Sequence, residues 1–206
     1  MKSQKAKTLE LVQLSMLAAL VVVLQLLSAL IPPIAGMVSI TLTLIPVVIG
    51  AILFGKKGGA ILGFVFGLIV MINCITGLDP GGNILWNTNP IFTALICLVK
   101  GTLAGFVPAL IYSVIVKNKE ISGKKKFFST MLAATLAPIV NTSIFVVGML
   151  VFFNETLTAW AGGKPIMLYI LVGLAGVNFL IEFIINIVLT PAIIRISDVV
   201  KKSKIR

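Results

Sequence analysis

Histidine is absent from these 206 residues, and acidic side chains are scarce, with six aspartates and glutamates against seventeen lysines and arginines. Without histidine, neither a Cys–His nucleophile nor a zinc site that uses imidazole is available. The two cysteines, Cys74 and Cys97, lack a partner motif, so we interpret both as buried apolar residues. No cluster of acids suits metal-assisted chemistry. We therefore expect neither enzymatic activity nor a metal or other cofactor.

Charge is scarce as well, because charged residues make up 11% of the chain, hydrophobic residues make up 59%, and the mean hydropathy is +1.15. A chain with so little polar surface is not a soluble globule, so the composition predicts an integral membrane protein. We expect one all-α membrane domain over residues 1–206, a six-transmembrane-helix bundle. The predicted helices cover residues 9–31, 38–54, 58–73, 91–116, 127–153 and 165–194.

Lysines and arginines gather on one side of this predicted bundle. Fifteen of the seventeen lie in the N-terminus, the turn at 55–57, the loop at 117–126 and the C-terminal tail. By the positive-inside rule, both the N- and C-termini are expected to be cytoplasmic. This placement is a topology signal that favours contact with lipid headgroups, and no nucleic-acid partner is expected.

The predicted outward loop at 74–90, "CITGLDPGGNILWNTNP", carries no cation. One interpretation makes Trp86 an apolar lid over a cavity mouth, with Asn87, Thr88 and Asn89 as hydrogen-bonding groups. The other makes Trp86 an interfacial anchor in an ordinary loop. The residues alone leave both interpretations open.

Lys100 is the one cation inside a predicted helix. It lies ten residues from Pro90 and seventeen from Lys117, which places it about 15 Å from the outer end and about 26 Å from the inner end. This depth in the outer half of the bilayer is too great for easy snorkelling to the surface. The same count brings Asn141 and Asn178 to a similar depth on the two predicted helices that follow.

Apart from Glu10 at the start of the first predicted helix, Glu182 is the only acid within a predicted helix, and with Asn178 and Asn186 it forms one polar stripe at four-residue spacing. In one interpretation Lys100 and Glu182 form an intramembrane ion pair, and the asparagines bridge helices. In the other, Lys100, Asn141 and Asn178 line an outward-opening pocket, where the ammonium receives a ligand carboxylate or phosphate. Glu182 lies about 6 Å deeper, which weakens direct pairing.

Small residues recur at four-residue spacing, which allows helix backbones to approach closely. The first predicted helix carries a further small-residue patch that could pack internally or dock a partner. The first group is Gly59, Gly63 and Gly67 with Gly101 and Gly105, and the patch is Ser15, Ala18 and Ala19.

The six-helix layout, with "SMLAAL", "ITLTLIPVVIGAILFGKKGGAILGFVFGLI", "LVKGTLAG" and "APIVNTSIFVVGML", resembles the substrate-binding S component of energy-coupling factor (ECF) transporters over essentially the whole chain. The resemblance implies a cell-membrane protein that captures a vitamin, with pantothenate the closest type. It implies two kinds of partner, a transmembrane T component and a pair of cytoplasmic ATPases, and this chain itself has no Walker A pattern. Ser15, Ala18 and Ala19 would match the family's docking surface.

A second function class remains open from the residues alone. A stand-alone secondary transporter of a small anionic metabolite could use Glu182 to couple transport to a proton or ion gradient. The sequence shows no convincing internal repeat, which counts against this alternative.

Overall fold

The computed structural model describes residues 4–29, 42–116, 123–174 and 176–203. Within these ranges the chain is all-helical, as predicted, and the described residues form no strand. The elements are α1 (Gln4–Ala29), α2 (Leu44–Thr76), α3 (Pro80–Thr88), α4 (Pro90–Val116), α5 (Gly123–Phe152), α6 (Asn154–Ala161), α7 (Ile166–Tyr169), the π-helical turn η1 (Ile170–Leu174), α8 (Gly176–Val188) and α9 (Thr190–Ser203).

Four helices, α1, α2, α4 and α5, are long and apolar enough to cross a membrane. The number rises to six if each of two bent helix pairs counts as one span. One pair joins α6 to α7 and η1 at 81°, and the other joins α8 to α9 at 52°. Large apolar side chains such as Leu11, Met16 and Val151 point outward and are more than half exposed, as expected for a surface that faces lipid.

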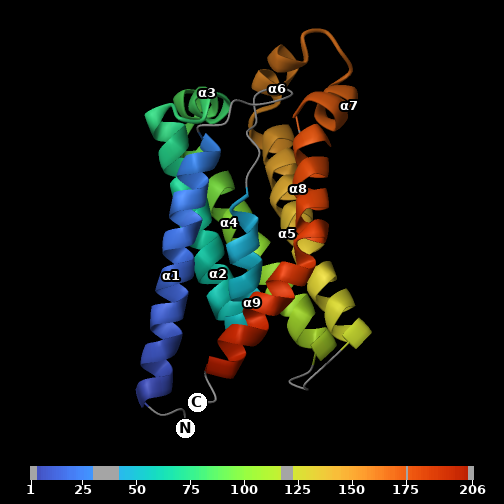
Figure 1. Cartoon of the computed structure of the whole chain (residues 1–206). Helices are drawn as coiled ribbons and strands as arrows, with labels where there is room; N and C mark the ends of the chain where they lie inside the picture. The colour runs from blue at the N-terminus through green and yellow to red at the C-terminus, as the bar shows by residue number, and fades with distance from the viewer. Residues whose placement is uncertain (1–3, 30–41, 117–122, 175, 204–206) are drawn as a thin grey trace.

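The helix α2 breaks at Gly55, where φ is +66° and favours glycine. The chain turns back there, and Figure 1 shows one leg descending and the other rising. The legs touch closely, because a Cβ on Gly59 would meet the Ala51 side chain. This break confirms the predicted turn at 55–57. Residues 38–41 of the predicted second helix lie outside the described part of the chain.

The rising leg of α2 packs directly against the backbone of α4. A Cβ built on Gly63 would overlap the carbonyl oxygen of Gly101, and one on Gly67 would overlap that of Cys97. Gly105 stands equally close to Gly59. The predicted close approach between these two helices is therefore confirmed. It depends on a glycine, which has no Cβ, at each contact.

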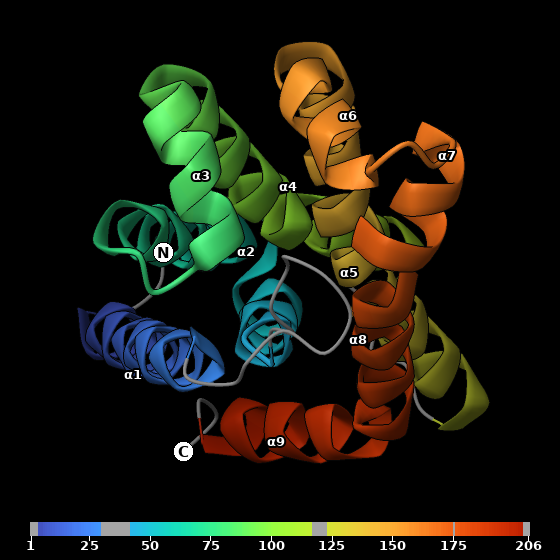
Figure 2. The same cartoon turned by 90° about the horizontal axis from the view of Figure 1, so that it is seen from above.

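The predicted last span, residues 165–194, is not one continuous helix, and this expectation was wrong. It divides into α7, η1 and α8, and the chain then bends into α9. Pro191 explains the second break, because its nitrogen cannot donate a hydrogen bond to the preceding turn and its ring clashes there. In the view from above, α9 extends from the end of α8 toward α1 (Figure 2).

Buried side chains form two hydrophobic clusters. The larger one joins α1, α2, α4, α5 and α9 around residues such as Phe66 and Leu62. The smaller one joins α3, α4, α5, α6 and η1 around Met149 and Leu157, at the end of the molecule that carries α3, α6 and α7 (Figure 1). The boundary between the two clusters lies beneath α3.

Substitution of Gly63 by alanine tests the contact between α2 and α4. Its Cβ would meet backbone, which cannot rotate away, so the free energy of unfolding should fall by roughly 1–3 kcal/mol despite the better helix propensity of alanine. Thermal unfolding in detergent measures the change. Val99→Ile, which also adds one carbon but on an exposed face of α4, should leave the melting temperature unchanged. Equal melting temperatures for the two variants would contradict this account.

Candidate functional site

A pocket lies beneath α3, where α2, α4, α5 and α6 converge. It stands at the end of the molecule opposite the start of α1 and the end of α9 (Figure 1). Its walls take residues from both hydrophobic clusters, such as Val70 from the larger and Leu85 from the smaller. Four polar or charged groups reach an otherwise apolar wall: Asp79, Thr93, Lys100 and the indole of Trp160.

The helix α3 covers this pocket, so the expectation that residues 74–90 form a loop was wrong. Asp79 caps the helix by accepting a hydrogen bond at Oδ1 from the Gly82 N–H, at 3.1 Å, and Pro80 supplies the first helical residue. The Asn83 side chain donates to the carbonyl of Cys74 at 2.8 Å, which ties α3 to the end of α2. The sequence signal was present, since Asp-Pro is typical of a helix N-terminus.

Lys100 reaches this pocket from α4. Its Nζ lies 5.0 Å from the centre of the Phe145 ring on α5, the geometry of a cation–π contact. The ring replaces part of the water that an ammonium would otherwise need. Glu182 is buried on α8 and does not line this pocket.

The Cys74 and Cys97 side chains form one face of the pocket, and each residue is more than nine-tenths buried. Both are free thiols, one on α2 and the other on α4. The prediction that both are buried is confirmed. Their place on the pocket wall is a feature that the sequence analysis missed.

The predicted asparagines occupy different positions. Asn141 is buried on α5, one turn before Phe145, and its side-chain oxygen has no partner among the described residues. The side chain of Asn178 lies outside the described part of the chain. Asn186 is buried on α8 and donates to the backbone oxygen of Glu182 at 2.8 Å. Neither Asn141 nor Asn186 lines the pocket beneath α3.

The predicted residues of α3 have local contacts. Trp86 packs against the larger hydrophobic cluster and does not line the pocket. Asn87 donates to the side chain of Asn83 at 3.1 Å, and Asn89 caps α4 by accepting from the Phe92 N–H at 3.1 Å. Thr88 donates to a backbone oxygen of its own helix.

Trp160 is the tryptophan that lines the pocket, and no local pattern distinguished it from Trp86. Its helix, α6, is followed by Gly162 and Gly163, which both adopt positive φ. This turn separates α6 from α7, whereas the break between α5 and α6 lies at Phe153.

The cavity at the centre of the pocket measures about 40 Å³. That volume holds a few water molecules, since each needs roughly 10–15 Å³, whereas pockets for drug-sized ligands measure roughly 300–1,000 Å³. A larger ligand therefore enters only if one wall moves.

The small-residue patch of α1 divides between two faces. Ser15 and Ala19 are exposed, while Ala18 is partly buried and packs against the larger cluster. Exposed apolar residues such as Met16 and Leu20 surround the exposed pair. This arrangement leaves a small-residue notch on the outer face of α1.

Comparisons with known proteins cover nearly the whole chain. Residues 9–194 match the family described as ECF transporter, substrate-specific component. The chain is also 30% identical over 200 residues to the pantothenic acid transporter PanT of Lactococcus lactis subsp. cremoris (strain MG1363). That alignment covers 93% of this chain and 94% of the relative.

Two substitutions of Asp79 separate its capping role from its charge. Asp79→Ala removes the N-cap and should lower the free energy of unfolding by about 0.5–2 kcal/mol, whereas Asp79→Asn keeps the acceptor and should be nearly neutral. Chemical or thermal unfolding in detergent gives both values. If the asparagine variant were as unstable as the alanine variant, the carboxylate charge and not the cap would hold α3.

Proposed function

We propose that this chain, which belongs to the family of ECF transporter substrate-specific components and is a multi-pass protein of the cell membrane, binds pantothenate from outside for ATP-driven uptake. The relative named as a pantothenic acid transporter supports this choice of ligand. Import then requires a transmembrane T component and two cytoplasmic ATPase subunits. This chain supplies the ligand site and the surface that docks these partners.

The proposed topology is a six-span bundle with both termini in the cytoplasm. The spans are α1, the two legs of α2, α4, α5 and α8. Exposed cations support this orientation, because Lys56 and Lys57 follow the break of α2 at Gly55 and Lys124 lies in the first turn of α5. The break of α2 and the start of α5 stand at the end of the molecule away from α3 and α6 (Figure 1). Labelling of a cysteine introduced at Lys57 by a membrane-impermeant reagent from outside would overturn the orientation.

The observation that carries the ligand assignment is the Lys100 ammonium in an apolar-walled pocket. The ammonium contacts the Phe145 ring, which carries no full negative charge. A ligand carboxylate would therefore form a strong charge-assisted contact there. Pantothenate has a carboxylate together with hydroxyl and amide groups. Asp79 also lines the pocket and can accept a hydrogen bond from a ligand hydroxyl, because Oδ2 is not used by the cap.

Entry of pantothenate requires a larger cavity. We propose that α6 moves away from the pocket to enlarge it. The α2–α4 wall cannot spread without separating its backbone contacts, whereas Trp160 stands on a short helix that ends in a two-glycine turn. Displacement of α6 would open the pocket toward the unpaired oxygen of Asn141, one turn below Phe145. We keep Asn141 and Asn178 as proposed ligand contacts in the opened state.

Replacement of Lys100 by methionine tests the anchor. It keeps much of the side-chain bulk but removes the charge, so pantothenate binding should weaken by roughly 2–5 kcal/mol. Titration in detergent, followed by Trp160 fluorescence in a Trp86→Phe background, measures affinity and reports movement of α6. Lys164→Met, the same change at an exposed site, should bind like the parent protein.

The competing ion-pair interpretation predicts a different result for the same variant. If Lys100 stabilises Glu182, then Lys100→Met should lower the melting temperature, and Glu182→Gln should restore it in the double variant. Restored stability with near-native affinity would overturn the ligand anchor. An unchanged melting temperature with lost affinity supports it.

Docking on the T component is proposed at the exposed notch of Ser15 and Ala19. Leucine at both positions should fill the notch and reduce assembly with the partner at least about tenfold, with pantothenate affinity unchanged, because close helix approach requires small residues. Co-purification from membranes and ligand titration give the two values. Val147→Leu, at an exposed position on α5 and away from this face of α1, is the matched control. A parallel loss of affinity would instead indicate that the notch packs internally.

A self-sufficient secondary transporter remains the second candidate, because Glu182 is a buried acid within a membrane helix. Liposomes that contain this chain alone separate the two functions. Binding without uptake supports the ECF assignment, whereas uptake driven by an ion gradient alone would overturn it.

A further inference from the structure

An apolar groove lies between the last turn of α4 and the first turns of α5, remote from the pocket beneath α3. It measures about 430 Å³ and is lined by Ile115 of α4 and by residues of α5 that include Phe128, Met131 and Leu132. Phe128 is 61% exposed and Leu132 is 41% exposed, so the groove opens to the surroundings of the protein. Its lining is almost entirely carbon, which suits a hydrocarbon chain.

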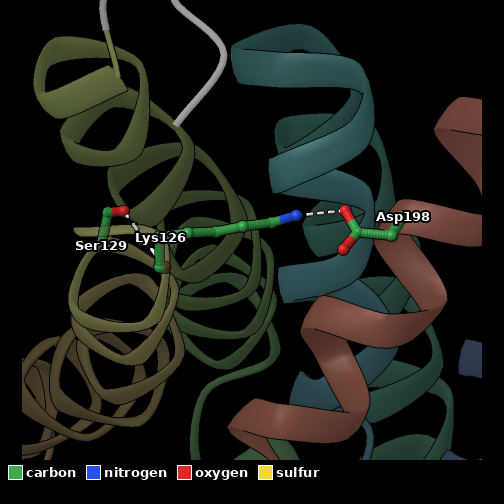
Figure 3. Close-up of polar contacts among 3 residues, drawn as sticks. All are labelled: Lys126, Ser129 and Asp198. Carbon is green, nitrogen blue, oxygen red and sulfur yellow. Dashed lines mark hydrogen bonds and ion pairs between the residues drawn. The ribbon is translucent and has the colours of Figure 1, made fainter. Parts of the chain in front are cut away.

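Positive charge is concentrated at the cytoplasmic-side end of this groove. The first turn of α5 carries Lys124, Lys125 and Lys126 and no acidic residue. Lys126 reaches across to α9 and pairs with Asp198 (Figure 3). Lys124 and Lys125 are exposed, and no carboxylate within the described ranges pairs with them.

The lysines and the groove share one face of α5. Lys125, Phe128 and Leu132 follow at i, i+3 and i+7, so the charge stands at one end of an apolar track about 10 Å long. Cations at a helix N-terminus oppose the helix dipole, so Lys124 and Lys125, which no carboxylate of the described residues neutralises, would attract an anion strongly there. A ligand with an anionic head and an apolar tail matches this order of groups.

We propose that this groove binds one anionic phospholipid of the membrane leaflet on that side. The phosphate lies against Lys124 and Lys125, and one acyl chain follows Phe128 and Leu132 toward Ile115. Basic groups beside grooves between membrane helices bind anionic lipid headgroups in this manner. Lys126 is held away by Asp198, which leaves the two other lysines for the lipid. The site is independent of the pantothenate pocket and does not rest on the ligand proposed there.

Native mass spectrometry of the purified full chain tests the site with phosphatidylglycerol and phosphatidylcholine as probes. Phosphatidylglycerol should be retained roughly tenfold more than phosphatidylcholine, and Lys124→Gln with Lys125→Gln should remove this preference. The matched control is Lys56→Gln with Lys57→Gln, an exposed lysine pair on the same side that does not line this groove. The control variant should keep the preference.

A second variant tests the apolar track without changing the charge. Leu132→Gln should reduce phosphatidylglycerol retention, while size-exclusion chromatography and the melting temperature check that the variant is folded. Equal retention of the two lipids by the parent protein would overturn the proposal. So would displacement of phosphatidylglycerol by an equal concentration of inorganic phosphate, because the acyl chain would then contribute nothing. The Lys124→Gln and Lys125→Gln variant could also retain phosphatidylglycerol like the parent protein but assemble less well with the T component. That result would overturn the proposal and show that these lysines contact the T component and not a lipid.

Discussion

Backbone contact between α2 and α4 is the constraint on which the pocket depends. Gly63 faces Gly101 and Gly67 faces Cys97 with no side chain between the helices, so both the distance and the register of the pair are set by the backbones themselves. This register brings Cys74 of α2 and Cys97 of α4 to the wall of one pocket, which Lys100 also lines. Packing of α4 against α2 thus holds the Lys100 ammonium at a partly apolar pocket wall, beside the Phe145 ring.

The two walls of the pocket differ in their freedom to move. The wall of α2 and α4 belongs to the larger hydrophobic cluster and contains the backbone contacts. The opposite wall includes Trp160 on the eight-residue helix α6, which packs on the smaller cluster and ends at a glycine turn. If the pocket takes the proposed ligand, a cavity of about 40 Å³ would couple ligand capture to displacement of the wall that carries α6.

The features that could be predicted from the sequence follow from local patterns. Apolar runs indicate membrane helices, four-residue spacing of glycine indicates close approach, and the resemblance to ECF substrate-specific components is confirmed by the family match. Asp79 before Pro80 and the position of Pro191 were also local signals, but the first was interpreted as part of a loop and the second was overlooked. Both mark helix boundaries in the structure.

The composition of the pocket could not be predicted in the same way. Trp160 of α6 and Phe145 of α5 line it because these helices pack beside α4, and no spacing in the sequence reports that packing. A count along each helix gives the depth of Asn141 but not the direction in which its side chain points. Lys100 was noticed because a charge in an apolar run is costly wherever it points.

The most direct test of the central claim changes the ligand and not the protein. Pantothenol replaces the carboxylate of pantothenate with an alcohol, so the two compounds differ at the group assigned to Lys100. Isothermal titration of the purified protein should give an affinity for pantothenate at least roughly tenfold higher, about 1.4 kcal/mol, and this preference should disappear in Lys100→Met. Equal affinities in the parent protein, or a preference that survives the loss of Lys100, would contradict the account.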